Sequence, residues 1–148
     1  MKYSIIIVFI MVVSAVFAAK GDPRLRRGQE LLDWIEGDMD GTFVVMFYDH
    51  DAPSARTSAM RQEIQNEILK EHPEFHYYEV DVQVEDNRSI VDECKINLQE
   101  TKHSPTVMIA SDGNGYWAHG QGAVADVKFQ LPYYSIDIRK QKGDIRRR

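Results

Sequence analysis

Histidine, aspartate and serine side chains gather at two places in the sequence. His50, Asp51 and Ser54 lie close together, and His103 and Ser104 follow later. These residue types form hydrolytic triads and metal sites, in which a base activates a nucleophile or several ligands surround an ion. Their spacing does not fix them together, and a metal would need a third or fourth ligand. We therefore predict no catalytic residues, no metal and no cofactor, and interpret them as a polar loop surface.

The elements beside the first group are a strand and a helix. Thr42–Tyr48 is a β-rich apolar run that is too short for a buried helix. The segment from Pro53 to about Glu71 carries apolar residues at helical spacing, namely Met60, Ile64, Ile68 and Leu69. The pattern predicts a buried strand that leads into a helix through a short turn.

This unit resembles the opening of the thioredoxin family, where a hydrophobic strand and a Cys-Gly-Pro-Cys turn precede a long helix. The four turn positions are Asp51, Ala52, Pro53 and Ser54, so the proline matches and both cysteines are missing. Thiol exchange needs a thiolate and a second, resolving thiol. The resemblance therefore implies the family's fold without its chemistry. A carboxylate at a helix start accepts backbone N–H bonds, so we expect Asp51 to cap the helix, with Asp49 as its rival.

Further elements follow in the family's order and extend the resemblance over residues 30–140. In the family fold, the turn before the long helix lies beside a loop that carries a cis-proline. The resemblance implies that Pro105 is this cis-proline and that His50, Asp51 and Ser54 approach His103 and Ser104. The matching segments are a strand at Phe75–Val82, a short helix at Asn87–Ile96, a strand at Ser104–Ala110, and a turn at Asp112–Gly115 leading into Tyr116–Gly120.

Composition indicates one folded domain. The 148 residues are 43 % hydrophobic and 28 % charged, which is typical of a globular protein. We predict an α/β fold, a thioredoxin-like domain with a central mixed sheet flanked by helices, over residues 30–140, preceded by an N-terminal hydrophobic helix. A first helix lies between Asp22 and Asp40 and ends near Gly37. A last helix lies between Ala123 and Lys142 and is broken or kinked at Pro132.

Cys94 is the only cysteine of the sequence, so no intramolecular disulfide can form. We interpret it as a half-buried structural thiol, because buried cysteines behave as small hydrophobic residues. An intermolecular disulfide is the alternative.

Charge is unevenly distributed around the net value of −5. A basic cluster of Arg24, Arg26 and Arg27 precedes the domain, and a basic C-terminal tail, residues 141–148, follows it. The acidic body argues against nucleic acid as a partner. The tail is suited to an acidic protein surface or to anionic lipid. The candidate interaction surface comprises His50, His103, Ser104, Arg146, Arg147 and Arg148.

An uncharged apolar run from Tyr3 to Ala19 has two interpretations. Residues 1–19 form either a signal peptide cleaved near Ala18 or a retained membrane anchor, joined to the domain by a linker at residues 20–29. If the anchor is retained, the basic residues after it keep the domain on the cytoplasmic or matrix side. The location is then the mitochondrial inner membrane or another organelle membrane; a cleaved signal leads to the secretory lumen or to secretion.

The function we predict is non-enzymatic. The chain is a redox-inactive accessory subunit of a larger membrane complex, for example of the respiratory chain, with other protein subunits as partners. The alternative is a secreted or endoplasmic-reticulum protein, similar to disulfide isomerases, that holds clients as a chaperone. In that compartment Asn87 of the triplet Asn87-Arg88-Ser89 would be an exposed glycosylation acceptor. A hydrolase using His50 or His103 is the weakest hypothesis.

Overall fold

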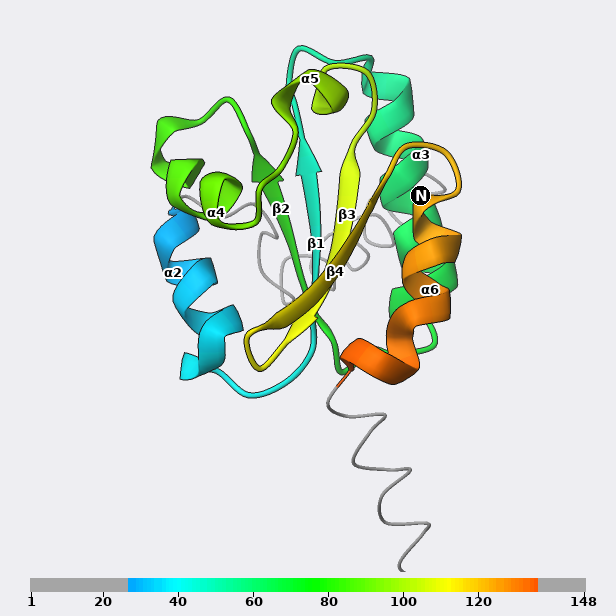
Figure 1. Ribbon diagram of the computed structural model, residues 1–148. Helices are drawn as coiled ribbons and strands as arrows, with labels where there is room; N and C mark the ends of the chain where they lie inside the picture. Colours follow the sequence, from blue (N-terminus) through cyan, green and yellow to red (C-terminus); the bar gives the residue numbers. More distant parts are fainter. Residues whose placement is uncertain (1–26, 136–148) are drawn as a thin grey trace, which may run out of the picture.

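The computed structural model describes residues 27–135 of the 148-residue chain (Figure 1). Predictions on residues 3–19, on most of the linker and on the basic tail fall outside this range. Within it, no helix is both long and apolar enough to cross a membrane. The elements are α2 (Gly28–Asp33), η1 (Trp34–Asp38), β1 (Phe43–Tyr48), α3 (Ser54–Ile64), η2 (Gln65–Leu69), β2 (His76–Asp81), η3 (Glu85–Asn87), α4 (Arg88–Glu93), α5 (Leu98–Thr101), β3 (Thr106–Ser111), β4 (Asn114–His119) and α6 (Ala123–Tyr134).

A mixed four-stranded sheet in the order β2-β1-β3-β4 forms the centre of the fold. β1 pairs in parallel with β2 and antiparallel with β3, and β3 pairs antiparallel with β4. Both faces of the sheet are covered by helices (Figure 1). This explains why the predicted strand at Thr42–Tyr48 is an uninterrupted apolar run, since a strand covered on both faces has no polar side. The α/β fold class and the mixed sheet are confirmed.

One face of the sheet packs against α3, η2 and α6. Val44 and Met46 of β1 point to this face and contact the helical residues whose spacing predicted the helix after Pro53. The helix is continuous from α3 into η2, where the Lys70 N–H donates to the Gln65 carbonyl at 3.0 Å in a π-helical turn. The predicted apolar spacing is therefore confirmed, because these helical residues form one side of the core.

The other face packs against α2 and α4. Phe43, Val45 and Phe47 of β1 point to it, as the alternation of side chains along a strand requires. α2 begins at Gly28, so the predicted linker at residues 20–29 extends two residues too far. The reason is packing, because Gly28 is buried directly against Asn87. The first helical segment ends near Gly37, which has φ 138°, as predicted.

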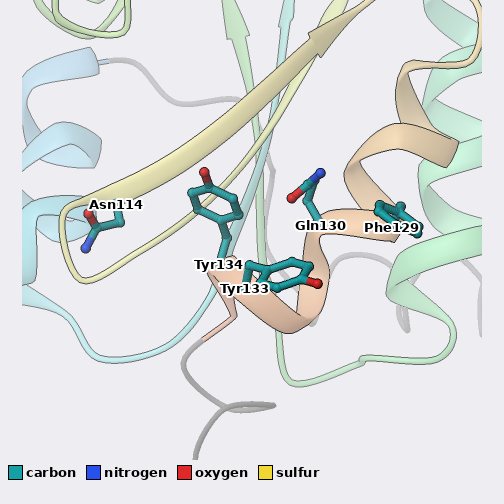
Figure 2. Close-up of a pocket in the computed structure, with 5 residues that line it drawn as sticks. All are labelled: Asn114, Phe129, Gln130, Tyr133 and Tyr134. Atoms are coloured by element: carbon teal, nitrogen blue, oxygen red, sulfur yellow. The ribbon is translucent and has the colours of Figure 1, made fainter.

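The last helix, α6, runs through Pro132 and ends two residues later, at Tyr134. Proline removes one donor from the helix, but the Ser135 N–H still donates to the Leu131 carbonyl at 2.9 Å and closes the last turn. The solvent side of α6 carries Phe129 and Tyr133, which line a surface hollow (Figure 2).

Candidate functional site

The turn between β1 and α3 is organised by the buried carboxylate of Asp49. Its Oδ1 atom accepts the Asp51 N–H at 2.8 Å and the Gln83 side-chain amide at 3.0 Å. The Asp49 carbonyl accepts the Ala52 N–H at 3.0 Å. Only 3 % of Asp49 is exposed, so its charge depends on these donors, and removing them would leave it uncompensated. Asp49 therefore stabilises the turn, although the sequence analysis named it only as the rival of Asp51.

The predicted capping of α3 by Asp51 is wrong. α3 begins after Pro53, and no side chain accepts a hydrogen bond from its first turn. Pro53 is the residue before the first helical one, with φ −55° and ψ 115°, and its carbonyl accepts the Arg56 N–H at 3.1 Å. Asp51 is left exposed, with a side-chain oxygen 3.3 Å from the Gln83 amide.

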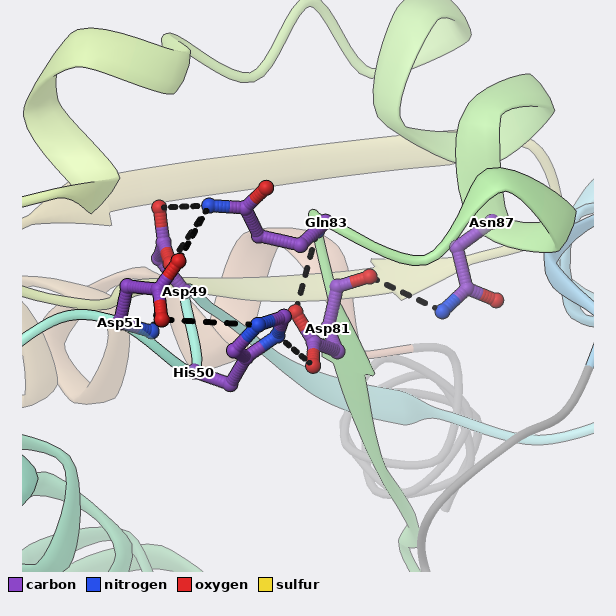
Figure 3. A network of polar contacts seen from close by, with 6 residues as sticks. All are labelled: Asp49, His50, Asp51, Asp81, Gln83 and Asn87. Carbon is purple, nitrogen blue, oxygen red and sulfur yellow. Dashed lines mark hydrogen bonds and ion pairs between the residues drawn. The ribbon is translucent and has the colours of Figure 1, made fainter.

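A second set of contacts joins this turn to the end of β2 (Figure 3). His50 Nδ1 lies 2.8 Å from Asp81 Oδ2, and the Gln83 N–H donates to Asp81 Oδ1 at 3.0 Å. The Asp81 carbonyl in turn accepts the Asn87 side-chain amide at 3.0 Å. Because β1 and β2 are parallel, their carboxyl ends meet at one edge of the sheet, and the network links the two loops that leave it. We call Asp49, His50, Asp51, Asp81 and Gln83 the polar network.

The polar network favours a charged histidine. The hydrogen bond to Asp81 and the Asp81 charge raise the pKa of His50 above its usual 6.5, with smaller contributions from Asp51 and Asp49. A histidine whose folded pKa is raised stabilises the fold below pH 6.5, and this contribution is lost as the pH rises through the folded pKa. The His50–Asp81 contact is therefore strongest in mildly acidic solution.

We expect an NMR titration of the His50 imidazole to give a pKa above 6.5. Asp81→Asn should bring the His50 pKa back toward 6.5, because it removes the largest cause of the shift. Asp51→Asn is the matched control and should lower the pKa less, since Asp51 acts only through its charge. A His50 pKa that does not respond to Asp81→Asn would contradict the contact.

A residue that was not predicted links α3 to the second group of polar residues. Arg56 of α3 donates from Nη1 to the His103 carbonyl at 2.9 Å, which ties the start of α3 to the loop after α5. Among residues 27–135, no hydrogen bond or ion pair joins His50, Asp51 or Ser54 to His103 or Ser104. A triad needs its nucleophile and base within hydrogen-bond reach, and this arrangement provides no such pair.

Metal ligation has no framework in the same region. Within the described part of the chain, no group of three or more histidine, cysteine, aspartate or glutamate side chains has the arrangement to hold an ion. In the polar network, the carboxylates of Asp49 and Asp81 are already occupied by N–H donors from the protein itself.

The prediction that Pro105 is cis is wrong. Residues 27–135 contain no cis peptide bond. The trans isomer of an X–Pro bond is favoured by about 0.5–1 kcal/mol, and here the loop reaches β3 without the cis form. The Pro105 carbonyl accepts the Gly120 N–H at 3.2 Å, and the Ser104 N–H donates to the Glu100 carbonyl at 3.2 Å. Both neighbours of the bond are thus placed by ordinary loop hydrogen bonds.

Cys94 closes α4 and packs against the core cluster of Phe43, Val45 and Phe47. In Figure 1, α4 lies on the opposite side of the sheet from α3. It is half-buried, as predicted. Burial, with smaller contributions from the charges of Glu93 and Glu36, raises the pKa of the Cys94 thiol to about 11. At neutral pH the side chain is a thiol and not the reactive thiolate.

The prediction that Asn87 is an exposed glycosylation acceptor is also wrong. Only 1 % of Asn87 is exposed, because its amide donates to the Asp81 carbonyl under the loop that leaves β2. Its Oδ1 atom is buried without a hydrogen-bond partner. A glycan on the nitrogen would remove the bond to Asp81 and has no room in this fold. The Asn87 side chain thus helps to fix the backbone of Asp81, which belongs to the polar network.

Two residues of the polar network escaped the sequence analysis. Asp81 was placed at the end of a strand and Gln83 was not singled out. The signal was present, since Asp49 and Asp81 both follow apolar strand residues, and carboxyl ends of parallel strands lie together. The sequence analysis did not predict that β1 and β2 pair, so it did not bring Asp49 and Asp81 together. Arg146, Arg147 and Arg148 lie outside the described residues.

Comparisons with known proteins identify the fold. No protein-family profile and no curated protein sequence matches the chain. Mitochondrial thioredoxin 3 from Saccharomyces cerevisiae superposes with a TM-score of 0.55 at 16 % identity, covering 73 % of this chain and 91 % of its own. Thioredoxin f2 from Chlamydomonas reinhardtii gives 0.55 at 14 % identity, covering 74 % and 92 %. Thioredoxin O1 from Arabidopsis thaliana gives 0.53 at 16 % identity, covering 75 % and 95 %. The chain has a thioredoxin-like fold.

Proposed function

We propose that this thioredoxin-like fold serves as a redox-inactive binding module, an accessory subunit of a larger membrane complex such as one of the respiratory chain. In this proposal residues 3–19 hold the chain at the mitochondrial inner membrane or another organelle membrane. Other protein subunits are its partners, and no cofactor takes part.

The observation that carries the proposal is the chemistry of the turn before α3. The resemblance places Asp51, Ala52, Pro53 and Ser54 at the positions of the thioredoxin Cys-Gly-Pro-Cys motif, and none of them has a thiol. Cys94 cannot replace one, because it lies across the sheet and its pKa is raised to about 11. Thiol exchange needs a thiolate and a resolving thiol, and the sequence offers one thiol far from the turn.

The same turn is well built for binding. Asp51, Pro53 and Ser54 are exposed, whereas Asp49 and Ala52 beneath them are buried. The buried Asp49 is fixed by hydrogen bonds within the turn and to Gln83 of the loop after β2, so the exposed residues lose little conformational freedom on contact with a partner. We call His50, Asp51, Pro53 and Ser54 the turn surface. A rigid polar surface of this kind suits recognition of another protein.

The charge of the turn surface favours a partner with basic side chains. Asp49, Asp51 and Asp81 gather around His50, so the surface has an excess of negative charge at neutral pH. A partner with basic side chains is therefore attracted to it, and unlike charges across an interface speed association and exclude wrong partners. The basic tail, with Arg146, Arg147 and Arg148, provides a separate contact of the opposite sign.

We expect the purified full chain to show no thiol–disulfide turnover. In an insulin-reduction assay with dithiothreitol, its rate should equal that of the buffer with reductant alone, because the turn has no thiol. Cys94→Ser should behave in the same way and should still bind its complex. As the positive control, a thioredoxin at the same concentration must give turnover. Activity above the blank that disappears in Cys94→Ser would contradict the proposal.

A further inference from the structure

Two aromatic side chains point to solvent from α6. Phe129 is 75 % exposed and Tyr133 is 65 % exposed, which makes them the two most exposed large apolar residues among residues 27–135. The other side of the helix, with Val124, Val127 and Leu131, fills the core. The solvent side of such a helix is ordinarily polar. The packing of the fold therefore does not account for Phe129 and Tyr133.

The aromatic pair borders an open hollow between α6 and the β3–β4 turn (Figure 2). Phe129 and Tyr133 are four positions apart on the helix, so they share one face. The hollow has a volume of about 620 Å³, and Asn114, Gln130 and Tyr134 complete its lining. Gln130 contributes a side-chain amide, which can both donate and accept a hydrogen bond. We call Phe129, Gln130 and Tyr133 the α6 face.

The charges beside the α6 face are net negative. Lys128, next to Phe129, pairs with Glu67 at 3.3 Å and with Glu71 at 3.4 Å. Asp126, one turn before Phe129, is exposed, and so are both glutamates. One ammonium group against three carboxylates leaves two negative charges at the surface. We call Glu67, Glu71 and Asp126 the acidic rim.

This charge and the small apolar area favour a short basic segment of another protein as the occupant. The acidic rim repels anionic lipid, and a second copy meeting it by the same face would bring the same charge against it. An aromatic side chain buries about 150–250 Å², so the pair covers less than the roughly 800 Å² that a folded partner needs. A hollow this open cannot enclose a small molecule as ligand pockets do.

Arginine suits both parts of this surface. Its guanidinium group pairs with carboxylates, and it is also attracted to the face of an aromatic ring. The exposed ring of Phe129 lies between Asp126, one turn earlier, and Tyr133, one turn later. A cation over Phe129 therefore meets a carboxylate on one side and a second ring on the other. An apolar neighbour of that arginine can lie in the hollow.

We propose that the α6 face and the acidic rim bind a short segment of a partner protein that carries arginine and apolar residues. Its apolar side chains lie in the hollow, and its guanidinium groups contact the ring of Phe129 and the acidic rim. The inference rests on the proposed function, because the partner is another subunit of the same complex. It adds a second contact, away from the turn surface. Ser135, which closes α6, lies 3.1 Å from Thr42 before β1, whereas the turn surface follows the other end of β1.

The test measures the binding of a synthetic peptide to the full-length chain in a non-ionic detergent. The probe is a short fluorescent peptide that contains arginine and leucine. Two matched peptides carry glutamate in place of arginine, or serine in place of leucine. Fluorescence anisotropy gives the dissociation constants, with empty micelles as the blank, and circular dichroism checks that each variant is folded.

We expect the arginine–leucine peptide to bind about tenfold more tightly than either matched peptide. Phe129→Ser with Tyr133→Ser should weaken its binding about tenfold, because both rings are lost. Both side chains are exposed, so the variant should remain folded.

A second pair of substitutions tests the acidic rim. Asp126→Asn with Glu71→Gln should weaken the binding about threefold and reduce its sensitivity to salt, because it removes the net negative charge. The matched control is Asp92→Asn with Glu93→Gln, which removes the same charge from exposed positions on α4. The control should bind the peptide as the unchanged chain does.

Unchanged binding in the Phe129→Ser, Tyr133→Ser variant would overturn the inference. If that binding instead falls in Asp51→Asn, the peptide occupies the turn surface, and the proposed function is left intact. Equal binding of the glutamate peptide, or no binding of the arginine–leucine peptide, would also overturn it. Thiol–disulfide turnover by the chain would contradict the proposed function without changing the binding of the peptide.

Three further results would assign the α6 face to another occupant and so overturn the inference. The first is binding to phosphatidylserine vesicles that Phe129→Ser with Tyr133→Ser abolishes, which would indicate lipid. The second is a dimer that the same substitutions dissociate, which would indicate a second copy. The third is a rise in peptide affinity when Arg146, Arg147 and Arg148 are replaced by glutamine, which would indicate competition from the basic tail of the chain itself.

Discussion

Arg61→Met is expected to lower the free energy of unfolding by about 2–4 kcal/mol. Arg61 of α3 holds Glu79 of β2 through two hydrogen bonds, from Nε at 2.6 Å and from Nη2 at 2.8 Å. Glu79 is only 3 % exposed, so its charge is removed from water and depends on these donors and on the Tyr77 hydroxyl at 2.8 Å. Methionine keeps the apolar stem of the side chain but has no guanidinium group, so it leaves a buried carboxylate without its cation.

Urea unfolding of the full chain, followed by circular dichroism, measures this loss. Arg88→Met is the matched control, because Arg88 pairs with Glu85 at 3.0 Å where both side chains are exposed. Such surface pairs contribute about 0–1 kcal/mol. Combining Arg61→Met with Glu79→Met should restore part of the stability, since no charge is then buried. An Arg61→Met variant as stable as Arg88→Met would contradict the role of the pair.

Gly28→Ala is expected to destabilise the fold by about 1–3 kcal/mol, although alanine is ordinarily the better helix former. A Cβ atom at position 28 would lie 2.7 Å from the Ile90 side chain and 2.8 Å from the Asn87 Cα atom. The second contact is with backbone, which cannot rotate away as a side chain does. α2 would have to move away from η3 and α4, and the core beneath it would open.

The matched control is Gln29→Ala, one residue further along α2. Gln29 is exposed and makes one hydrogen bond, to Asp33 at 2.7 Å. Its replacement should change the stability by no more than about 0.5 kcal/mol. Chemical denaturation gives both values, and hydrogen exchange of the α4 amides should rise only in Gly28→Ala. Equal stability of the two variants would show that α2 does not pack as closely as the structure indicates.

Local patterns predicted the elements of this fold well. The apolar run at Thr42–Tyr48 became β1, and the spacing of Met60, Ile64 and Ile68 became the buried side of α3 and η2. Such patterns succeed because each follows from the burial of one face or one strand, which depends on nearby residues alone. The order of the elements then supplied the fold through the resemblance.

Contacts between distant residues limited the prediction of the site. Asp51 was expected to cap α3, but Pro53 starts the helix unaided and Asp49 fixes the turn through Gln83, more than thirty residues away. Asn87 was expected at the surface, but its amide serves the Asp81 carbonyl. In each case a polar side chain makes a hydrogen bond to a buried group of another loop. The local sequence pattern does not show which buried groups need such a partner.

The fold and the site support different parts of the account. The thioredoxin-like fold is common to proteins whose sequences differ widely, so it does not itself assign an activity. The assignment to a binding role depends on the turn surface, where exposed polar residues rest on the buried Asp49. A direct test must therefore ask what this surface contacts in the cell.

Site-specific photo-crosslinking from position 54 is that measurement. A photoreactive amino acid replaces Ser54 of the turn surface in one variant, and in the control it replaces the exposed Gln62 on α3. After illumination of native membranes, Ser54 should give one discrete adduct that migrates within a large complex on a native gel and is unchanged by reductant. Gln62 should give none of this species. A broad ladder of adducts equal at both positions, or an adduct that reductant releases, would contradict the account of a redox-inactive accessory subunit.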